Sequence, residues 1–151
     1  MANKWDIFYL KMARLVSTQS KDPSTQTGAV IVRPDKTLCS VGFNGFPQRM
    51  DDHERFYNDR EQKYSRIIHC EMNALLLARE PVKGYTLYTY SFISCDRCCV
   101  HMIQAGIVRA VFPALPDELE ERWGKQSILS KAYYAEAGVE IVEVPREAFS
   151  D

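Results

Sequence analysis

Residues 85–112 read YTLYTYSFISCDRCCVHMIQAGIVRAVF, and the fold class follows most directly from this stretch. Tyr85 to Tyr90 is short and rich in aromatic and β-branched residues, which favours a strand. Cys95 to Ala105 predicts a helix that stops at Gly106, because glycine readily adopts the left-handed conformation found after a helix. Ile107 to Phe112 is apolar and predicts the next strand. A strand, a helix and a strand in this order predict parallel pairing with the helix across one face of the sheet.

The flanking segments extend this alternation. Before the stretch, the sequence predicts a helix over 3–19, a hairpin over 28–43, an irregular polar loop over 44–66 and a helix over 69–79. After it come a largely helical segment over 117–137 and a strand over 139–144. An opening hairpin followed by alternating strands and helices makes the sheet mixed. We therefore expect a single α/β domain over residues 1–151, a three-layer α/β/α sandwich around a mixed five-stranded sheet.

Composition excludes several classes of protein. The 151 residues suit one domain, and 46% of them are hydrophobic, which excludes a disordered or collagen-like chain. The formal net charge of −1 argues against a strongly basic nucleic-acid binder. No apolar run approaches the roughly 18 residues of a membrane-spanning helix, and the first residues do not resemble a signal peptide. We therefore expect a cytoplasmic protein that binds neither membranes nor nucleic acid.

The cysteines indicate metal chemistry rather than disulfides. Their number is five, and three of them, Cys95, Cys98 and Cys99, fall within five positions. An odd, clustered set is poorly suited to a disulfide framework. In a reducing compartment such a cluster is typical of metal ligands or reactive thiols.

Two short motifs at predicted helix starts form the candidate site. His69 and Glu71 make one, Cys95 and Cys98 make the other 26 positions later, and one predicted strand lies between them. Neighbouring helix starts at one edge of a sheet bring an imidazole and two thiolates toward one ion. Three protein ligands with a fourth position open are the coordination of a catalytic zinc, and helix dipoles favour the thiolate form.

Glu71 need not bind the metal. It is placed to take a proton from water at the open position and pass it to a substrate, which suits hydrolytic attack on an electron-poor carbon. Each motif by itself is weak evidence, since His69 can be a core histidine and Glu71 a helix-dipole acid. A structural zinc module is the alternative from another class. It requires a fourth protein ligand, for which Cys70 and Cys99 are the near candidates, and it leaves Glu71 without a role.

On these residues the chain resembles the zinc-dependent cytidine/deoxycytidylate deaminase superfamily, and within it the deoxycytidylate (dCMP) deaminases. His69, Glu71, Cys95 and Cys98 match the H-x-E…C-x-x-C pattern of zinc nucleobase deaminases. Further similar blocks are KDPSTQTGAVIV at 21–32, GFNGFP at 42–47, MIQAGI at 102–107 and the tail from 122 to 140. The resemblance implies a cytidine-deaminase-like fold and a Zn²⁺ cofactor held by His69, Cys95 and Cys98, with Glu71 carrying the proton.

The resemblance also implies substrate contacts. Asn44 is expected to hydrogen-bond the sugar or base, and the backbone N–H of Cys70 to contact the base. Phe92 is expected to pack against the pyrimidine, although a core aromatic is the alternative. The candidate phosphate contacts are Lys21, Ser24 and Thr25, which are also ordinary turn residues.

The chain departs from the family pattern at two positions beside the motifs. Cys70 stands where alanine is usual, which places a thiol beside the zinc site. Ser94 stands where proline is usual, and we expect its hydroxyl to cap the following helix. Neither change removes a catalytic group.

The implied reaction is dCMP plus water to dUMP plus ammonia, which supplies the precursor of thymidylate. Regulation by dCTP and dTTP and a homo-oligomer (dimer, tetramer or hexamer) are implied by the same resemblance. The same zinc chemistry on cytidine, dCTP, guanine or tRNA adenosine is the second interpretation. The low net charge disfavours tRNA.

Overall fold

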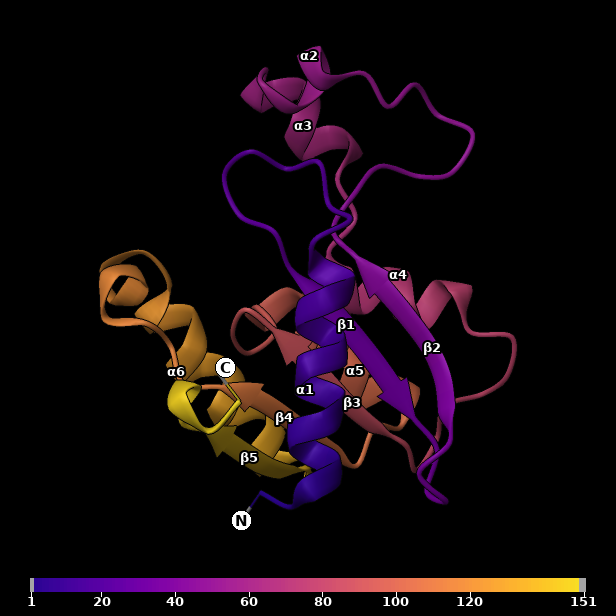
Figure 1. Ribbon diagram of the computed structural model, residues 1–151, viewed down its shortest axis with the longest axis vertical. Coiled ribbons are helices and arrows are strands. Elements are labelled where there is room, and N and C mark those ends of the chain that lie inside the picture. The colour runs from indigo at the N-terminus through magenta and orange to yellow at the C-terminus, as the bar shows by residue number, and fades with distance from the viewer. Residues whose placement is uncertain (1, 150–151) are drawn as a thin grey trace.

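A mixed five-stranded sheet forms the centre of the molecule (Figure 1), in a computed structural model that describes residues 2–149. Its strands are β1 (Gly28–Val32), β2 (Leu38–Phe43), β3 (Thr86–Tyr90), β4 (Arg109–Pro113) and β5 (Glu140–Val144). They lie in the order β2-β1-β3-β4-β5. β1 pairs antiparallel with β2 and β3, whereas β3, β4 and β5 pair in parallel. The mixed sheet predicted from the sequence is confirmed.

Helices cover both faces of this sheet. The helices of the molecule are α1 (Lys4–Ser17), α2 (Glu54–Tyr57), α3 (Arg60–Arg66), α4 (Cys70–Leu77), α5 (Asp96–Ala105) and α6 (Glu120–Glu136), with 3-10 turns η1 (Asp117–Leu119) and η2 (Arg146–Ala148). α1 crosses one face, and α4, α5 and α6 lie on the other (Figure 1), which gives the predicted three layers. No helix within residues 2–149 is long and apolar enough to cross a membrane.

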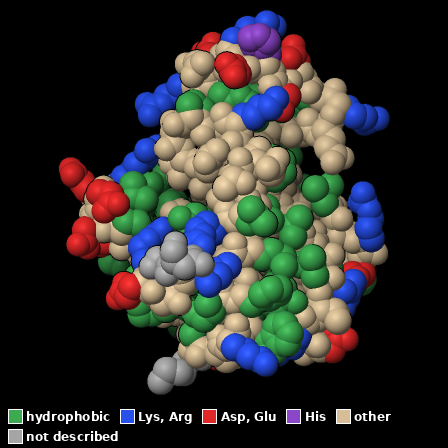
Figure 2. Space-filling view, in the orientation of Figure 1, with side chains coloured by type: hydrophobic (Ala, Val, Ile, Leu, Met, Phe, Trp, Pro, Cys, Tyr) green, Lys and Arg blue, Asp and Glu red, His purple; other side chains and the backbone are tan. Residues whose placement is uncertain are grey.

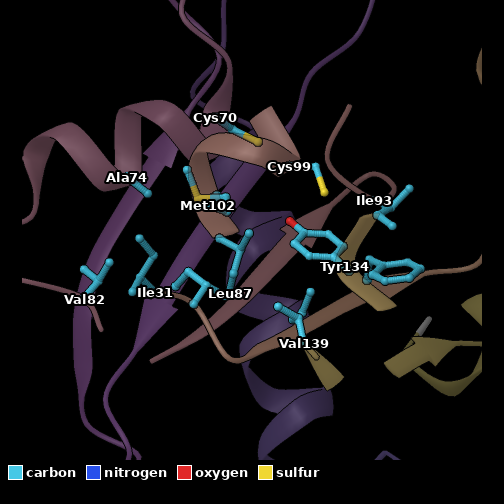
Figure 3. Packing of buried hydrophobic residues seen from close by; sticks show 14 residues of the cluster. Ile31, Cys70, Ala74, Val82, Leu87, Ile93, Cys99, Met102, Tyr134 and Val139 are labelled. Atoms are coloured by element: carbon cyan, nitrogen blue, oxygen red, sulfur yellow. The ribbon is translucent and has the colours of Figure 1, made fainter. Parts of the chain in front are cut away.

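The two faces of β1 supply the two halves of the core. Ala29 and Ile31 join the cluster under α4, α5 and α6, whose members converge in Figure 3. Val30 and Val32 point the other way and join the cluster under α1. Successive side chains of a strand alternate between faces. The continuous apolar run of β1 is therefore explained by burial on both sides.

Two glycines let helices approach the hairpin closely. A Cβ atom on Gly28 would lie 2.1 Å from the carbonyl oxygen of Ala13 in α1. A Cβ atom on Gly42 would lie 2.4 Å from the backbone nitrogen of Ala74 in α4. Both contacts are with backbone, so any larger residue would push a helix away. Gly42 thereby helps to fix the position of α4, the helix whose N-cap is His69.

The segment expected as an irregular loop over 44–66 contains α2 and α3, so that expectation was wrong in part. His53 caps α2 by accepting the N–H of Arg55 on Nδ1, and Asp59 caps α3 by accepting the N–H of Gln62. The segment projects beyond the sheet in Figure 1, and Figure 2 shows mixed basic and acidic side chains at that end. Short helices with polar surfaces carry no clear apolar periodicity, so the pattern did not reveal them.

A buried carboxylate ties α1 to the sheet. Asp6 has 0% of its surface exposed and accepts two hydrogen bonds from the Arg109 guanidinium, at 2.7 and 2.8 Å. The Tyr88 hydroxyl and the Asn3 backbone N–H donate to it as well, at 2.9 and 3.0 Å. Burial alone would raise the pKa of Asp6, but the hydrogen bonds from Arg109, Asn3 and Tyr88 outweigh it and lower the pKa below its usual value.

Candidate active site

The three candidate ligands lie at the starts of two helices. His69 is the N-cap of α4, Cys95 is the N-cap of α5, and Cys98 lies in the first turn of α5. Cys95 caps its helix by accepting the Cys98 N–H on Sγ, at 3.4 Å. The expectation that Ser94 caps this helix is therefore wrong. Ser94 is buried, and its carbonyl accepts the Ser130 hydroxyl of α6 at 2.7 Å.

The donor atoms of these residues converge. His69 Nδ1 lies 3.4 Å from Cys95 Sγ and 3.2 Å from Cys98 Sγ, and all three atoms lie within 4.8 Å of one another. Tetrahedral zinc with Zn–S near 2.3 Å and Zn–N near 2.0 Å separates nitrogen from sulfur by about 3.6 Å. One imidazole and two thiols at these separations fit a zinc ion with small adjustments.

A fourth protein ligand is missing from the part of the chain that the structure describes. None of Cys70, Cys99 and Glu71 has a donor atom within 4.8 Å of all three ligand atoms at once. Cys99 is fully buried and its thiol faces the Ser130 carbonyl at 3.5 Å. Structural zinc sites are closed by four protein ligands, whereas catalytic ones keep a position open. The arrangement therefore favours a catalytic site over a structural module.

The surroundings favour a thiolate at Cys95. Hydrogen bonds from the Cys98 thiol and from His69, together with the Cys98 backbone N–H, lower the pKa of Cys95 to about 4, although burial opposes them. The pKa of His69 is raised, first by its hydrogen bond to Cys95 and then by the charge of Glu71. Since the thiolate is the form that binds metal, the helix start is prepared for a cation. Burial instead raises the pKa of Cys70 well above its usual value, so that thiol stays neutral.

A cavity of about 140 Å³ opens beside the three ligands. Glu71, only 4% exposed, lines it together with His69 and Cys95. Glu71 lies in the first turn of α4, two residues after His69, and is not one of the converging donors. A carboxylate is thus held beside the metal position, on the side where a substrate would enter.

The cavity brings together most of the predicted substrate residues. Ser24, Thr25, Asn44, Cys70 and Phe92 line it. Asn44 is buried, and its amide holds the neighbouring turn: Nδ2 donates to Asp22 at 3.2 Å and to the Thr25 carbonyl at 2.9 Å, while Oδ1 accepts the Thr27 N–H at 2.9 Å.

Lys21 does not line the cavity. Its ammonium pairs with the Asp52 carboxylate at 2.9 Å, and both side chains are about half exposed. The resemblance implied that Lys21 lies near the nucleotide together with Ser24 and Thr25, but the Lys21 side chain is directed to Asp52 instead. Lys21 thus differs from the other predicted contacts, which the structure gathers around one space.

Sequence reasoning did not single out several residues that line the cavity. They are Lys63, Tyr64, Ile67, Arg122 and Trp123, together with Asp22, which lies in the 22–25 segment expected near the nucleotide. The length of the polar segment 44–66 indicated function there without singling out any residue. Arg122 and Trp123 were noted only as members of the block from 122 to 140 that resembles the family, and no role was predicted for either. Phe92 and Trp123 lie with ring centroids 5.4 Å apart and form an aromatic wall.

Comparisons with known proteins agree with this site. A family model described as the cytidine and deoxycytidylate deaminase zinc-binding region matches residues 3–114. An Aliivibrio fischeri protein described as an uncharacterized deaminase in the luxG 3′ region is 37% identical over 145 residues, which are 96% of this chain and 97% of that protein. A probable deoxycytidylate deaminase of Caenorhabditis elegans is 35% identical over 146 residues, 93% of this chain and 71% of that protein.

A solved structure agrees in fold. The dCMP deaminase of cyanophage S-TIM5, in its apo form, superposes with a TM-score of 0.73 at 21% identity. The superposition covers 95% of this chain and 100% of the phage chain. At this identity the likeness concerns the fold, and it matches the α/β arrangement predicted from the sequence.

Proposed function

Because the chain belongs to the cytidine and deoxycytidylate deaminase family, we propose that it catalyses the zinc-dependent hydrolysis of dCMP to dUMP and ammonia. The observation that carries the proposal is the three-donor site with Glu71 beside it in the wall of a substrate-sized cavity. The name of the Caenorhabditis elegans relative supports the choice of dCMP.

The chain's own residues divide the work of the reaction. His69, Cys95 and Cys98 would hold the zinc ion, which when bound lowers the pKa of water at the open position toward about 7. Glu71 takes a proton from water as the water oxygen bonds to C4 of cytosine, and delivers this proton to N3. Glu71 then takes the remaining proton from the hydroxyl added at C4 and delivers it to the exocyclic amine, so that the C4–N bond breaks, the C4=O bond forms and ammonia leaves. Burial of Glu71 shields these transfers from solvent.

Two features of the cavity support recognition of a nucleotide. Phe92 and Trp123 offer an aromatic wall for the pyrimidine. Arg122 is exposed, lies over the Trp123 ring at 5.0 Å and has no carboxylate partner among residues 2–149. An available guanidinium suits a phosphate, which it can bind through two hydrogen bonds. We therefore assign the 5′-phosphate to Arg122, with the hydroxyls of Ser24 and Thr25 beside it.

Other parts of the sequence-based interpretation stay predictions. They are control by dCTP and dTTP, the supply of dUMP for thymidylate, the homo-oligomer and the cytoplasmic location. The contacts of Asn44 and Cys70 with the substrate stay predictions as well. Deaminases acting on dCTP or cytidine use the same zinc chemistry. The test of the proposed function therefore compares dCMP with dCTP and with a cytosine nucleoside.

The test follows the fall in ultraviolet absorbance as the zinc-loaded protein acts on dCMP, deoxycytidine and dCTP. We expect kcat/KM for dCMP to exceed that for deoxycytidine by about 10- to 100-fold, the contribution of one charge-assisted phosphate site. Arg122→Met should remove most of this preference, while Lys125→Met, which removes a charge from the same helix, should not. A preference for dCTP or deoxycytidine would move the substrate assignment. No turnover of any of them with one zinc ion per chain would overturn the function.

A further inference from the structure

The Asp22 carboxylate joins three separate parts of the cavity wall. Its Oδ1 accepts the backbone N–H groups of Ser24 at 2.8 Å and Thr25 at 3.4 Å, which forms the turn after α1. Its Oδ2 accepts the Asn44 amide at 3.2 Å, and Lys63 Nζ lies 2.8 Å from Oδ1. Only 6% of the Asp22 side chain is exposed. One buried charge therefore orders the turn, the Asn44 loop and α3 together.

Lys63 brings the projecting segment into this network. It lies on α3, which stands with α2 beyond the end of the sheet (Figure 1). Its side chain is only 13% exposed, although lysine is normally at the surface. The chain re-enters the body through a two-way backbone bridge between Gly45 and Ile68. Lys63–Asp22 is thus a buried ionic link between this segment and the substrate cavity.

We propose that Lys63 is a positioning residue for the substrate cavity and acts through Asp22. The ion pair holds the 22–27 turn and the Asn44 amide in place, and it keeps Tyr64 and Ile67 of the following chain against the cavity. This inference rests on the proposed function, because its first readout is turnover of dCMP. Lys63 is not assigned any contact with the reacting atoms.

A direct bond from Lys63 to the substrate phosphate is the rival role, and burial argues against it. Removing one partner from a buried ion pair leaves an uncompensated charge, which is strongly unfavourable. A phosphate could therefore recruit Lys63 only by abandoning Asp22 or by adding a second anion beside it. Arg122 lines the same cavity and is already exposed, so the phosphate has a cation that needs no such exchange.

The kinetic test compares Lys63→Met and Lys63→Arg in the zinc-loaded full chain. Because a displaced turn and Asn44 amide weaken the binding of substrate and transition state alike, we expect Lys63→Met to raise KM for dCMP by about 10- to 100-fold. Zinc content should stay at one ion per chain and kcat should stay within about threefold, since Glu71 and the ligands are untouched. Lys63→Arg, which keeps the charge, should recover most of the loss.

Deoxycytidine, which has the same base and sugar without the phosphate, separates the two roles. If Lys63 positions the wall, Lys63→Met raises KM for deoxycytidine as well as for dCMP, and the rise for dCMP is the larger because the 22–27 turn also carries Ser24 and Thr25. A loss confined to dCMP would make Lys63 a phosphate ligand and overturn the proposal. An unchanged KM for both substrates would overturn it as well.

A second readout does not depend on the reaction. Lys63→Met, Asp22→Asn and the double variant are compared by thermal unfolding, with Lys125→Met as the matched control for loss of an exposed lysine. We expect Lys63→Met to lower Tm much less in the Asp22→Asn background than in the wild type, because the buried charge is already gone. Equal shifts in both backgrounds would show that the pair is not coupled and would refute the positioning role. Coupled shifts in a protein that fails to act on dCMP would refute only the proposed function.

Discussion

Two polar clusters lie on the same sheet, and they differ in whether their side chains satisfy one another by hydrogen bonds. Asp6, Arg109 and Tyr88 meet near the amino end of β4, where one carboxylate satisfies a guanidinium, a hydroxyl and a backbone N–H. His69, Cys95 and Cys98 meet beyond the carboxyl end of β3, where one imidazole nitrogen and two sulfur atoms lie within 4.8 Å of one another. The first cluster is complete by itself and stabilises the fold. The second has the donor set of a zinc site, so we expect it to need a metal ion.

Removal of a ligand should have the largest effect. Cys98→Ala leaves two of the three donors, so we expect zinc content to fall well below one ion per chain and deamination to become undetectable. Metal analysis and the absorbance assay check this. Cys99→Ala, next along the chain and outside the donor set, is the matched control and should retain zinc. Full activity of Cys98→Ala would contradict the site.

Glu71→Gln should separate proton transfer from metal binding. The amide keeps the size of the side chain but cannot accept the proton, so kcat should fall by about 10²- to 10⁴-fold. Zinc should remain bound, because Glu71 is not one of the converging donors. Steady-state kinetics with metal analysis on the same sample measure both. Loss of zinc together with activity would make Glu71 a ligand instead.

Arg109→Met should show the opposite behaviour at the other cluster. It leaves the Asp6 carboxylate buried without its cation, which typically costs about 3–5 kcal/mol of stability. For a chain of this size we expect Tm to fall by about 10 °C. Asp6→Asn/Arg109→Met removes both charges and should cost less.

At a temperature where the variant is folded, kcat of Arg109→Met should equal that of the wild type. Thermal melts and kinetics on the same preparation measure the two effects. A large loss of kcat in folded protein would mean that the two clusters are not independent.

The pH dependence of stability should be the smallest of these effects. The pKa of Asp6 in the folded chain is below the ordinary value of 3.8, so the unfolded chain binds the proton more tightly. The Asp6 contribution is therefore full above about pH 4 to 5 and is lost as pH falls through the lowered pKa. Tm of the wild type should drop more steeply between pH 5 and pH 3 than Tm of Asp6→Asn/Arg109→Met. Parallel curves would contradict the role of Asp6.

The part of the site that could be predicted is local in sequence. His69 and Glu71 share one helix start, and Cys95 and Cys98 share another, so helix geometry already placed each pair. The strand between the two motifs, β3, then predicted that both pairs meet at one edge. The structure brings His69, Cys95 and Cys98 within reach of one ion, as expected.

The remainder of the cavity comes from distant segments. Asp22, Lys63 and Arg122 lie about 40 and 60 positions apart, and each by itself is an ordinary surface charge in the sequence. Lys21 looked equally suitable for a phosphate, yet its side chain pairs with Asp52 away from the cavity. Ser94 likewise suited a helix cap. The helix begins at Asp96 rather than at Cys95 as predicted, so Cys95 is the N-cap.

The sequence by itself determined the mixed sheet, the alternation of strands and helices outside residues 44–66, and the three donors that converge, because apolar periodicity and helix starts act over a few residues. Only the tertiary structure decided which charges face the substrate. Asp22 and Lys63 become a buried pair because α3 folds back over the turn after α1. Because the pair is buried, removing one partner is expected to cost far more stability than at the surface. No local pattern encodes an encounter between side chains 41 positions apart.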